Sequence, residues 1–247
     1  RAGQTVGLLM ENHPDCLSAL AALSRLGAVP VLINPTARGT ALAHALSVGQ
    51  VHDLIIGPGH HDLRTATGVR HLYLGMPTPQ IALPPPPPGS VDLEQLRAQL
   101  PSDLPQNPGR ASDLALLMFT SGTTGQPKAA RISNRRFMMA ATATCAGCDL
   151  TPTDTVYCCL PLYHGTGLWL AVGGALLGGS RLALAPRFST RGFWQDVRRT
   201  GATVVFYVGE LCRYLVAAPP TALEKGHAVR LFVGNGMRAD VWQQLLH

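Results

Sequence analysis

The sequence predicts an α/β protein with mostly parallel sheets flanked by helices. Short apolar runs alternate with helical patterns along most of the chain, and each run is apolar over its whole length, as in strands covered on both faces. Apolar residues make up 46% of the 247 residues and charged residues only 14%. This composition provides a large buried core and excludes a disordered or highly charged tail protein.

Residues 1–75 form the first predicted α/β segment. Gly27 and Gly49 follow its two helical patterns, and Pro14 lies in the first turn of the first pattern. The predicted order is strand 6–10, helix 14–26, strand 29–33, helix 40–48, strand 53–56 and a short strand at 71–74.

Residues 76–112 form a proline-rich connection. Five consecutive prolines at 84–88 favour an extended polyproline stretch, and a short helical pattern follows at 91–100. A spacer is favoured over the alternative, a ligand that docks on a partner protein.

Residues 113–247 form the second predicted segment. An apolar strand from residue 114 leads into a polar loop, after which the elements alternate again. The predicted order is strand 129–132, strand 156–160, a buried helix of about 12 residues, strand 182–184, helix 191–199, strand 203–208, helix 210–217, strand 229–233 and a final helix from 239. Because the chain opens on Arg1 and closes inside a helical pattern, we expect truncation at both ends.

The stretch from Thr155 to Ser180 has no Asp, Glu, Lys or Arg, which raises the alternative of a membrane-spanning helix. Pro161, His164 and six glycines interrupt it, so a buried strand, a loop and a buried helix are favoured.

The charge distribution and the cysteine content indicate which kind of partner and which cellular compartment to expect. The net charge is +6, but the basic residues are spread along the chain and aromatics are only 6%, which argues against a dedicated nucleic-acid surface. No secretory leader is visible, and the six cysteines show no regular framework, which favours a reducing, cytoplasmic setting. Cys145 and Cys148 have the spacing of a redox motif but fall late in a helical stretch, so buried thiols are favoured.

The most informative stretch is the loop at 120–128, Thr-Ser-Gly-Thr-Thr-Gly-Gln-Pro-Lys. Its glycines let the backbone approach a ligand, its hydroxyls add donors, and its lysine supplies a point charge, a combination that suits a polyphosphate. Only Lys128 and Lys225 are lysines among the 20 basic residues. A Walker loop is excluded, because Pro127 replaces its second glycine and Ala129 its Mg²⁺-binding hydroxyl.

The same nine residues resemble the phosphate-binding signature of the adenylate-forming superfamily, which includes acyl-CoA synthetases, luciferases and peptide-synthetase adenylation domains. Other stretches resemble one branch, the very-long-chain acyl-CoA synthetase and fatty acid transport protein family. They are residues 9–14, 26–29, 32–34, 38–39, 160–164, 173–179, 209–215 and 234–236.

The resemblance implies the N-terminal portion of a large catalytic domain and a two-step ligase. A long- or very-long-chain fatty acid would react with ATP to give acyl-adenylate and pyrophosphate, and CoA would then displace AMP. The implied catalytic residues are Thr123, Lys128 and His164. The implied nucleotide-binding residues are Thr120, Ser121, Gly122, Thr123, Thr124, Gly125, Lys128, Gly234, Asn235 and Gly236, and the acyl site would include Tyr163, His164 and Gly165.

Without the resemblance, the residues are also compatible with purely structural roles. A single histidine such as His164 is more often structural, and Gly234–Gly236 could be a plain turn. The family carboxylate that holds Mg²⁺ would lie beyond residue 247, so no metal ligand is assigned and residues 1–247 alone are expected to be inactive. Alternatives are a non-catalytic component of fatty-acid uptake or transport, a ligase of the same superfamily for another carboxylic acid, and a structural fragment without a ligand. Peripheral membrane association is a further possibility, and the oligomeric state is open.

Overall fold

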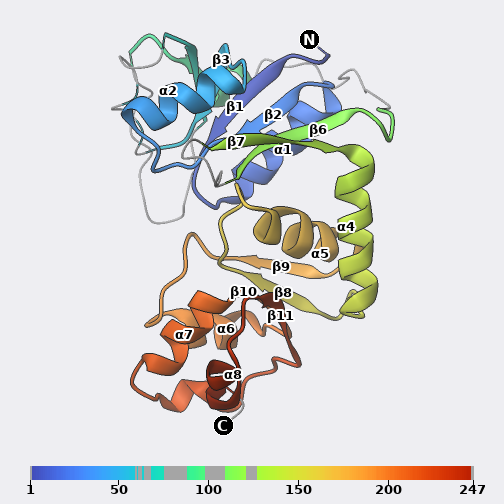
Figure 1. The fold of residues 1–247 in the computed structure, drawn as a ribbon, viewed down its shortest axis with the longest axis vertical. Coiled ribbons are helices and arrows are strands. Elements are labelled where there is room, and N and C mark those ends of the chain that lie inside the picture. The colour runs from blue at the N-terminus through green and yellow to red at the C-terminus, as the bar shows by residue number, and fades with distance from the viewer. Residues whose placement is uncertain are drawn as a thin grey trace. The chain divides into compact units, whose positions relative to one another are not determined.

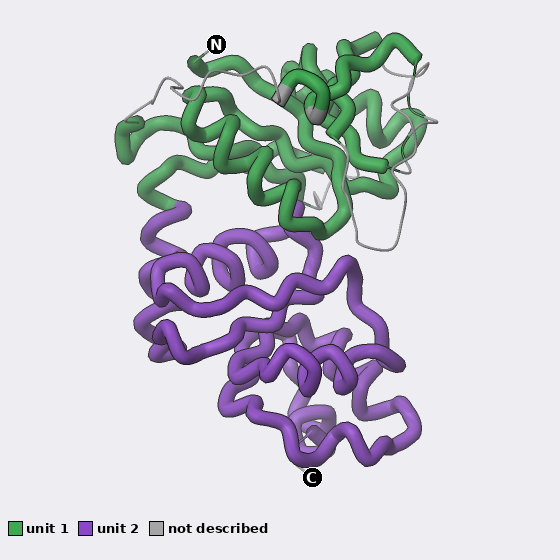
Figure 2. The backbone as a smooth tube through the Cα atoms, turned by 180° about the vertical axis from the view of Figure 1, so that it is seen from behind, with its two compact units in different colours: residues 1–136 green, residues 137–247 purple. Residues whose placement is uncertain are grey.

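The chain divides into two compact units, residues 1–136 (unit 1) and 137–247 (unit 2), shown in different colours in Figure 2. The computed structural model describes residues 2–58, 60, 63, 68–74, 88–97, 109–120 and 127–245. The predicted boundary at 75/76 lies outside these residues and the one at 112/113 lies within them, and both stay predictions. Each unit contains its own sheet and its own core.

Unit 1 is built on a seven-stranded sheet in the order β5-β4-β3-β1-β2-β6-β7 (Figure 1). Its described strand pairs are parallel, except that β6 and β7 form an antiparallel hairpin. The elements are β1 (Thr5–Leu9), α1 (Pro14–Arg25), β2 (Val29–Leu32), α2 (Gly39–Val48), β3 (Asp53–Ile56), β4 (Arg70–Tyr73), β5 (Val91–Asp92), α3 (Leu93–Arg97), β6 (Leu114–Thr120) and β7 (Lys128–Ser133).

Local sequence accounts for the first elements of unit 1. The four residues of β2 and of β3 are all buried, as expected for strands covered on both faces. Helix α1 begins at Pro14, where the His13 side chain accepts a hydrogen bond from the Asp15 N–H, and Gly27 follows it with a φ of 69°. The chain runs from β1 to β2 and then back across β1 to β3, so right-handed connections place α1 and α2 on opposite faces.

Unit 2 is built on a four-stranded sheet in the order β11-β10-β8-β9, and its described pairs are all parallel. Helix α4 begins in the last residues of unit 1 and continues into unit 2. The elements are α4 (Asn134–Gly147), β8 (Thr155–Cys158), the π-helix η2 (Thr166–Val172), α5 (Gly173–Gly178), β9 (Arg181–Leu184), α6 (Phe193–Thr200), β10 (Val204–Val208), α7 (Gly209–Ala217), the 3₁₀-helix η3 (Ala222–Glu224), β11 (Leu231–Asn235) and α8 (Ala239–Leu245).

The parallel α/β architecture predicted from the sequence is confirmed, with local differences. The helical pattern predicted at 91–100 begins with the short strand β5, so that α3 starts only at Leu93. The predicted strand 229–233 is shifted towards its C-terminus, because β11 pairs with β10 so that Gly234 lies opposite Tyr207. The uncharged stretch at 155–180 contains β8, a turn, η2 and α5. Within the described part of the chain, no helix is long and apolar enough to cross a membrane.

Candidate functional site

The two ends of the hydroxyl-rich loop meet at the tip of the β6–β7 hairpin. Thr120, the last residue of β6, pairs with Lys128, the first residue of β7, and both are exposed. The Thr120 hydroxyl donates to the Lys128 carbonyl at 3.5 Å. The hairpin therefore holds Lys128 beside the start of the loop. The other predicted loop residues lie outside the described residues: Ser121, Gly122, Thr123, Thr124 and Gly125.

Strand β6 brings this loop to the carboxyl edge of the unit 1 sheet. Its residues Leu116–Met118 are buried, whereas Thr120 at its end is exposed. Because β6 runs parallel to β2, Thr120 lies at the edge where open α/β sheets bind their ligands. The geometry thus agrees with a ligand-binding role for the loop.

Helix α2 contacts the other end of the loop. The His44 Nε2 atom lies 2.8 Å from the carbonyl oxygen of Pro127, the residue before Lys128. No local pattern in the sequence predicts this contact, because the two residues are 83 positions apart.

Tyr163 and His164 lie side by side in the turn after β8. Their ring centroids are 4.5 Å apart at an interplanar angle of 48°. The turn is closed by hydrogen bonds on both sides of His164, whose backbone N–H donates to the Pro161 carbonyl at 3.1 Å and whose carbonyl accepts from the Leu168 N–H at 3.0 Å. Protein atoms around the ring partly desolvate it and lower the pKa of His164 below the ordinary value of histidine, which favours the neutral imidazole at pH 7.

Gly165 connects this turn to the π-helix η2. A Cβ atom at residue 165 would overlap the Trp169 indole, so the close approach of that ring requires glycine. Single π-helical turns are rare and occur often at functional sites. The three predicted acyl-site residues are therefore adjacent, at the start of an unusual helix.

Gly234, Asn235 and Gly236 form a tightly packed corner with the end of β10. A Cβ at Gly234 would overlap the Tyr207 carbonyl, and a Cβ at Gly209 would overlap the Gly236 carbonyl. Gly236 has a φ of 72°, which favours glycine. Gly234 and Asn235 end β11 itself, so this segment is a strand end whose backbone packs closely and not a plain turn.

The predicted residues of unit 2 share one edge of its sheet. His164 follows β8, Gly209 follows β10, and Asn235 ends β11, and these three strands are parallel neighbours. Glu210, in the first turn of α7, pairs with Arg213, and that guanidinium lowers the pKa of the Glu210 carboxyl. The carboxyl edge of unit 2 is therefore its candidate ligand-binding edge.

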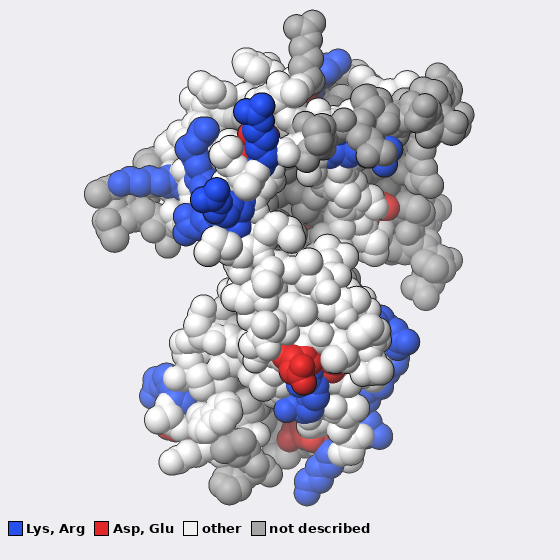
Figure 3. All heavy atoms as spheres, turned by 90° about the vertical axis from the view of Figure 1, so that its right-hand side faces the viewer, with Lys and Arg blue, Asp and Glu red and all other residues white. Residues whose placement is uncertain are grey.

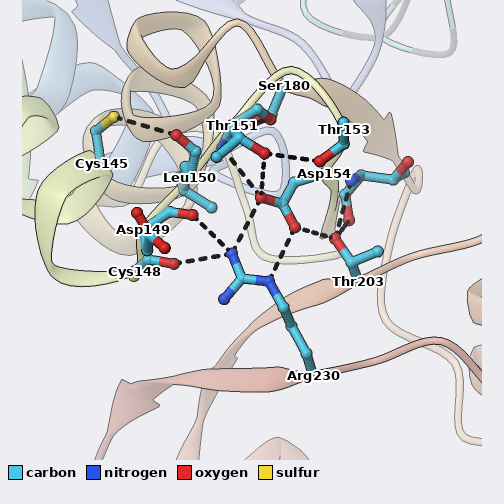
Figure 4. Close-up of polar contacts among 11 residues, drawn as sticks. Cys145, Cys148, Asp149, Leu150, Thr151, Thr153, Asp154, Ser180, Thr203 and Arg230 are labelled. Atoms are coloured by element: carbon cyan, nitrogen blue, oxygen red, sulfur yellow. Dashed lines mark hydrogen bonds and ion pairs between the residues drawn. The ribbon is translucent and has the colours of Figure 1, made fainter.

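Sequence reasoning missed a polar cluster at the opposite edge of the same sheet (Figure 4). Asp154 precedes β8, Thr203 precedes β10 and Arg230 precedes β11. Asp154 accepts from Arg230 Nε and Nη2, both at 3.0 Å, and from the Thr203 hydroxyl at 2.7 Å. It also accepts from the Thr151 N–H at 3.0 Å. The Arg230 guanidinium, with the Thr203 hydroxyl, holds the pKa of the Asp154 carboxyl well below its usual range.

A second missed cluster lies at the carboxyl edge of unit 1. The His60 Nε2 atom is 2.8 Å from Glu11 Oε1, and the His60 Nδ1 atom is 3.3 Å from Arg38 Nη2. Burial opposes the ionisation of Glu11, but the contact with His60 and the charge of Arg38 outweigh it and lower the Glu11 pKa. These three residues follow β1, β2 and β3, respectively. No local sequence pattern shows that they become neighbours in the folded sheet.

Within the described residues, no three His, Cys, Asp or Glu side chains gather into a group that could hold a metal ion.

The exposed face of β7 and the start of α4 are basic. Arg131, Arg135 and Arg136 are exposed there, and the sequence has no Asp or Glu between residues 114 and 148. Figure 3 shows Lys and Arg side chains gathered on one side of unit 1.

Comparison with known proteins places these features in context. Residues 1–247 match the family model of AMP-binding enzymes. The chain is 35% identical over 255 residues to long-chain fatty acid transport protein 6 of Mus musculus, and 34% identical over 249 residues to the medium/long-chain-fatty-acid–CoA ligase FadD6 of Mycobacterium tuberculosis. These alignments cover 100% and 98% of this chain but 40% of each relative.

Solved structures share the fold. The long-chain-fatty-acid–CoA ligase FadD1 of Archaeoglobus fulgidus superposes with a TM-score of 0.84 at 21% identity, covering 100% of this chain and 49% of the other. ATP-bound MatB of Rhodopseudomonas palustris superposes with a TM-score of 0.83 at 24% identity, covering 99% of this chain and 47% of the other.

Proposed function

The chain belongs to the AMP-binding enzyme family, and on that premise we propose that it is part of a long- or very-long-chain fatty acid–CoA ligase. The ligase FadD6 and the fatty acid transport protein, both about one-third identical, support a fatty acid as the acid that is activated. The chain spans about 40% of the length of these relatives, so the proposal concerns the full-length polypeptide that contains residues 1–247.

One observation carries the proposal. Thr120 and Lys128, the two ends of a sequence rich in hydroxyls and glycine, pair at the tip of the β6–β7 hairpin, at the carboxyl edge of a parallel sheet. Backbone N–H groups, hydroxyls and one lysine together match the oxygens of a polyphosphate. We assign Thr120–Gly125 and Lys128 to the β- and γ-phosphates of ATP.

The proposed reaction has two steps. A carboxylate oxygen of the fatty acid attacks the α-phosphorus of ATP, and the bond to pyrophosphate breaks. The CoA thiolate then attacks the acyl carbonyl, and AMP leaves. Lys128 and the loop donors, including Thr123, stabilise the charge that develops on the departing pyrophosphate. No step is assigned to Mg²⁺, whose carboxylate ligand is expected beyond residue 247.

The carboxyl edge of unit 2 is proposed to hold the acyl-adenylate. His164 is neutral at pH 7 and can donate one hydrogen bond to a phosphate or acyl oxygen without introducing a charge. Tyr163 and Gly165 would border the acyl chain. Gly234–Gly236, where the missing Cβ atom of Gly234 lets β11 pack closely on the Tyr207 carbonyl, would lie against the nucleotide.

The two lysines of the chain allow a matched test. Lys128→Ala should lower fatty-acid-dependent ATP–pyrophosphate exchange by the full-length polypeptide roughly a hundredfold, the typical loss for one electrostatic transition-state contact. Lys225→Ala, which removes an exposed lysine of unit 2, should leave the rate unchanged. Equal rates for the two variants would refute the assignment of the loop.

Two alternatives have separate tests. Relatives named as fatty acid transport proteins favour a non-catalytic role in uptake or transport, and fatty-acid uptake that persists in the inactive Lys128→Ala variant would support it. A ligase for another carboxylic acid would form more acyl-CoA with aromatic than with long-chain acids.

We also propose that a cytoplasmic form of the protein associates peripherally with membranes through Arg131, Arg135 and Arg136. Such exposed cations attract anionic lipid headgroups, and salt weakens the attraction. The protein should cosediment with phosphatidylcholine vesicles only when they contain phosphatidylserine, and Arg135→Glu/Arg136→Glu should abolish this. Equal binding to neutral vesicles would contradict the proposal.

A further inference from the structure

His44 is the side chain that connects helix α2 to the end of the hydroxyl-rich loop. It lies in the middle of α2, is half-buried, and brings Nε2 to 2.8 Å from the Pro127 carbonyl oxygen. A carbonyl oxygen can only accept, so Nε2 carries the hydrogen and donates it. The backbone just before Lys128 is thus held by a residue from a different element.

Because residue 127 is a proline, this contact has a strong effect on the orientation of the following peptide. The proline ring fixes φ, and proline has no N–H for the ladder of the sheet, so the orientation of the peptide between Pro127 and Lys128 depends on ψ of Pro127. Because the peptide is planar and trans, a carbonyl held towards α2 directs the Lys128 N–H to the opposite side. The partner of the Pro127 carbonyl therefore sets the direction in which the chain enters β7.

A second contact restrains the same short segment. The Lys128 carbonyl accepts from the Thr120 hydroxyl, and the two residues pair across the hairpin. Two successive carbonyls, those of Pro127 and Lys128, are each held by a side chain from another part of unit 1. Together these contacts fix the backbone from which the Lys128 side chain extends.

We propose that His44 is a positioning residue for the phosphate-binding loop, one that keeps Lys128 oriented towards the polyphosphate of ATP. The inference rests on the proposed function of the loop. It gives helix α2, which contributes no residue to the loop motif at 120–128, an indirect effect on nucleotide affinity. His44 does not touch the ligand in this proposal and acts only through the Pro127 carbonyl.

Three variants of the full-length polypeptide test the inference. His44→Ala removes the donor, and His44→Gln keeps an N–H donor on a side chain of similar length. His52→Ala is the matched control, because His52 is an exposed histidine of unit 1 just before β3, at the amino edge of the sheet. Calorimetry gives the affinity for pyrophosphate and ATP, steady-state kinetics give KM for ATP and for the fatty acid, and thermal unfolding gives Tm.

We expect His44→Ala to weaken pyrophosphate and ATP binding and to raise the KM for ATP roughly fivefold to tenfold, the usual effect of one lost hydrogen bond. The KM for the fatty acid and the Tm should stay near those of the His52→Ala control, and His44→Gln should restore most of the ATP affinity.

Three other results are possible, and each would contradict a different part of the proposal. Unchanged ATP affinity in His44→Ala, or no rescue by His44→Gln, would overturn the role of His44 and leave the proposed function intact. A fall in Tm with an equal rise in both KM values would show that His44 only packs α2 onto β7. If the unaltered protein binds neither pyrophosphate nor ATP, the proposed function of the loop itself fails.

Discussion

The two edges of the unit 2 sheet differ in what their polar side chains contact. At the amino edge, Asp154, Thr203 and Arg230 are joined by hydrogen bonds to one another and to nearby backbone groups (Figure 4). At the carboxyl edge, the side chains of His164 and Asn235 form no hydrogen bond with the protein that the structure describes there.

This difference distinguishes polar side chains that bond to one another from polar side chains that remain available for other contacts. Polar groups that satisfy one another contribute to folding, because breaking one contact leaves its partner unsatisfied. Groups held in place but without a protein partner remain available to a ligand. We therefore expect substitutions of polar side chains at the amino edge to change mainly the free energy of unfolding, and substitutions of polar side chains at the carboxyl edge to change mainly activity. The following predictions run from the largest to the smallest effect on that free energy.

Asp154→Ala should produce the largest loss, about 3 kcal/mol, because it removes the acceptor of several hydrogen bonds, two of them from a cation. Unfolding in denaturant measures it. The control Asp149→Asn changes a neighbouring exposed acid and suits the positive φ of 47° at that position, so its effect should be below about 0.5 kcal/mol. Equal losses in both variants would mean that the Asp154 cluster has no special role.

Gly209→Ala should cost about 2 kcal/mol, because its Cβ would overlap the Gly236 carbonyl and the two strand ends would have to separate. It should also lower activity, since it displaces the corner assigned to the nucleotide. Gly201→Ala provides a contrast: no atom lies near a Cβ there, and only the strain of its φ of 64° is added. A Gly209→Ala protein with full stability and full activity would contradict the close packing.

The Asp154 cluster also makes a prediction about pH. Its carboxyl has a lower pKa when folded than in the unfolded chain, where the value is about 3.9. Its contribution to stability is therefore present above pH 4 and is lost as the pH falls through the folded pKa. The stability difference between the unaltered protein and Asp154→Asn should shrink below pH 4. A difference independent of pH would show that the carboxylate charge is not involved.

His164→Gln should change the free energy of unfolding least, by under about 0.5 kcal/mol, because the imidazole is exposed and forms no described hydrogen bond. Formation of acyl-CoA by the full-length polypeptide should nevertheless fall at least tenfold. A large loss of stability with unchanged catalysis would instead indicate that His164 has a structural role, as is more common for a single histidine.

Much of the fold follows from local pattern. Fully apolar runs such as β2 and β3, separated by helices that end near glycine, predicted parallel strands covered on both faces, and the structure confirms this. The exact end of β11 did not follow, because it depends on the register with β10 and not on the strand's own residues.

The candidate site was predictable to different degrees in its different parts. The loop ending at Lys128 was found from composition alone, because its glycines, hydroxyls and lysine are adjacent in sequence. The residues that contact the ends of that loop could not be predicted in this way. Neither α2 nor its His44 carries any local feature that predicts a contact with Pro127.

The sequence by itself determined the alternation of strands and helices, the chemistry of the loop and the family resemblance, because each is written in neighbouring residues. The tertiary structure alone decided which distant side chains meet: Asp154 with Arg230 across 76 positions, and His44 with Pro127 across 83. Local pattern encodes burial and backbone conformation, whereas such partnerships exist only after particular elements have become neighbours.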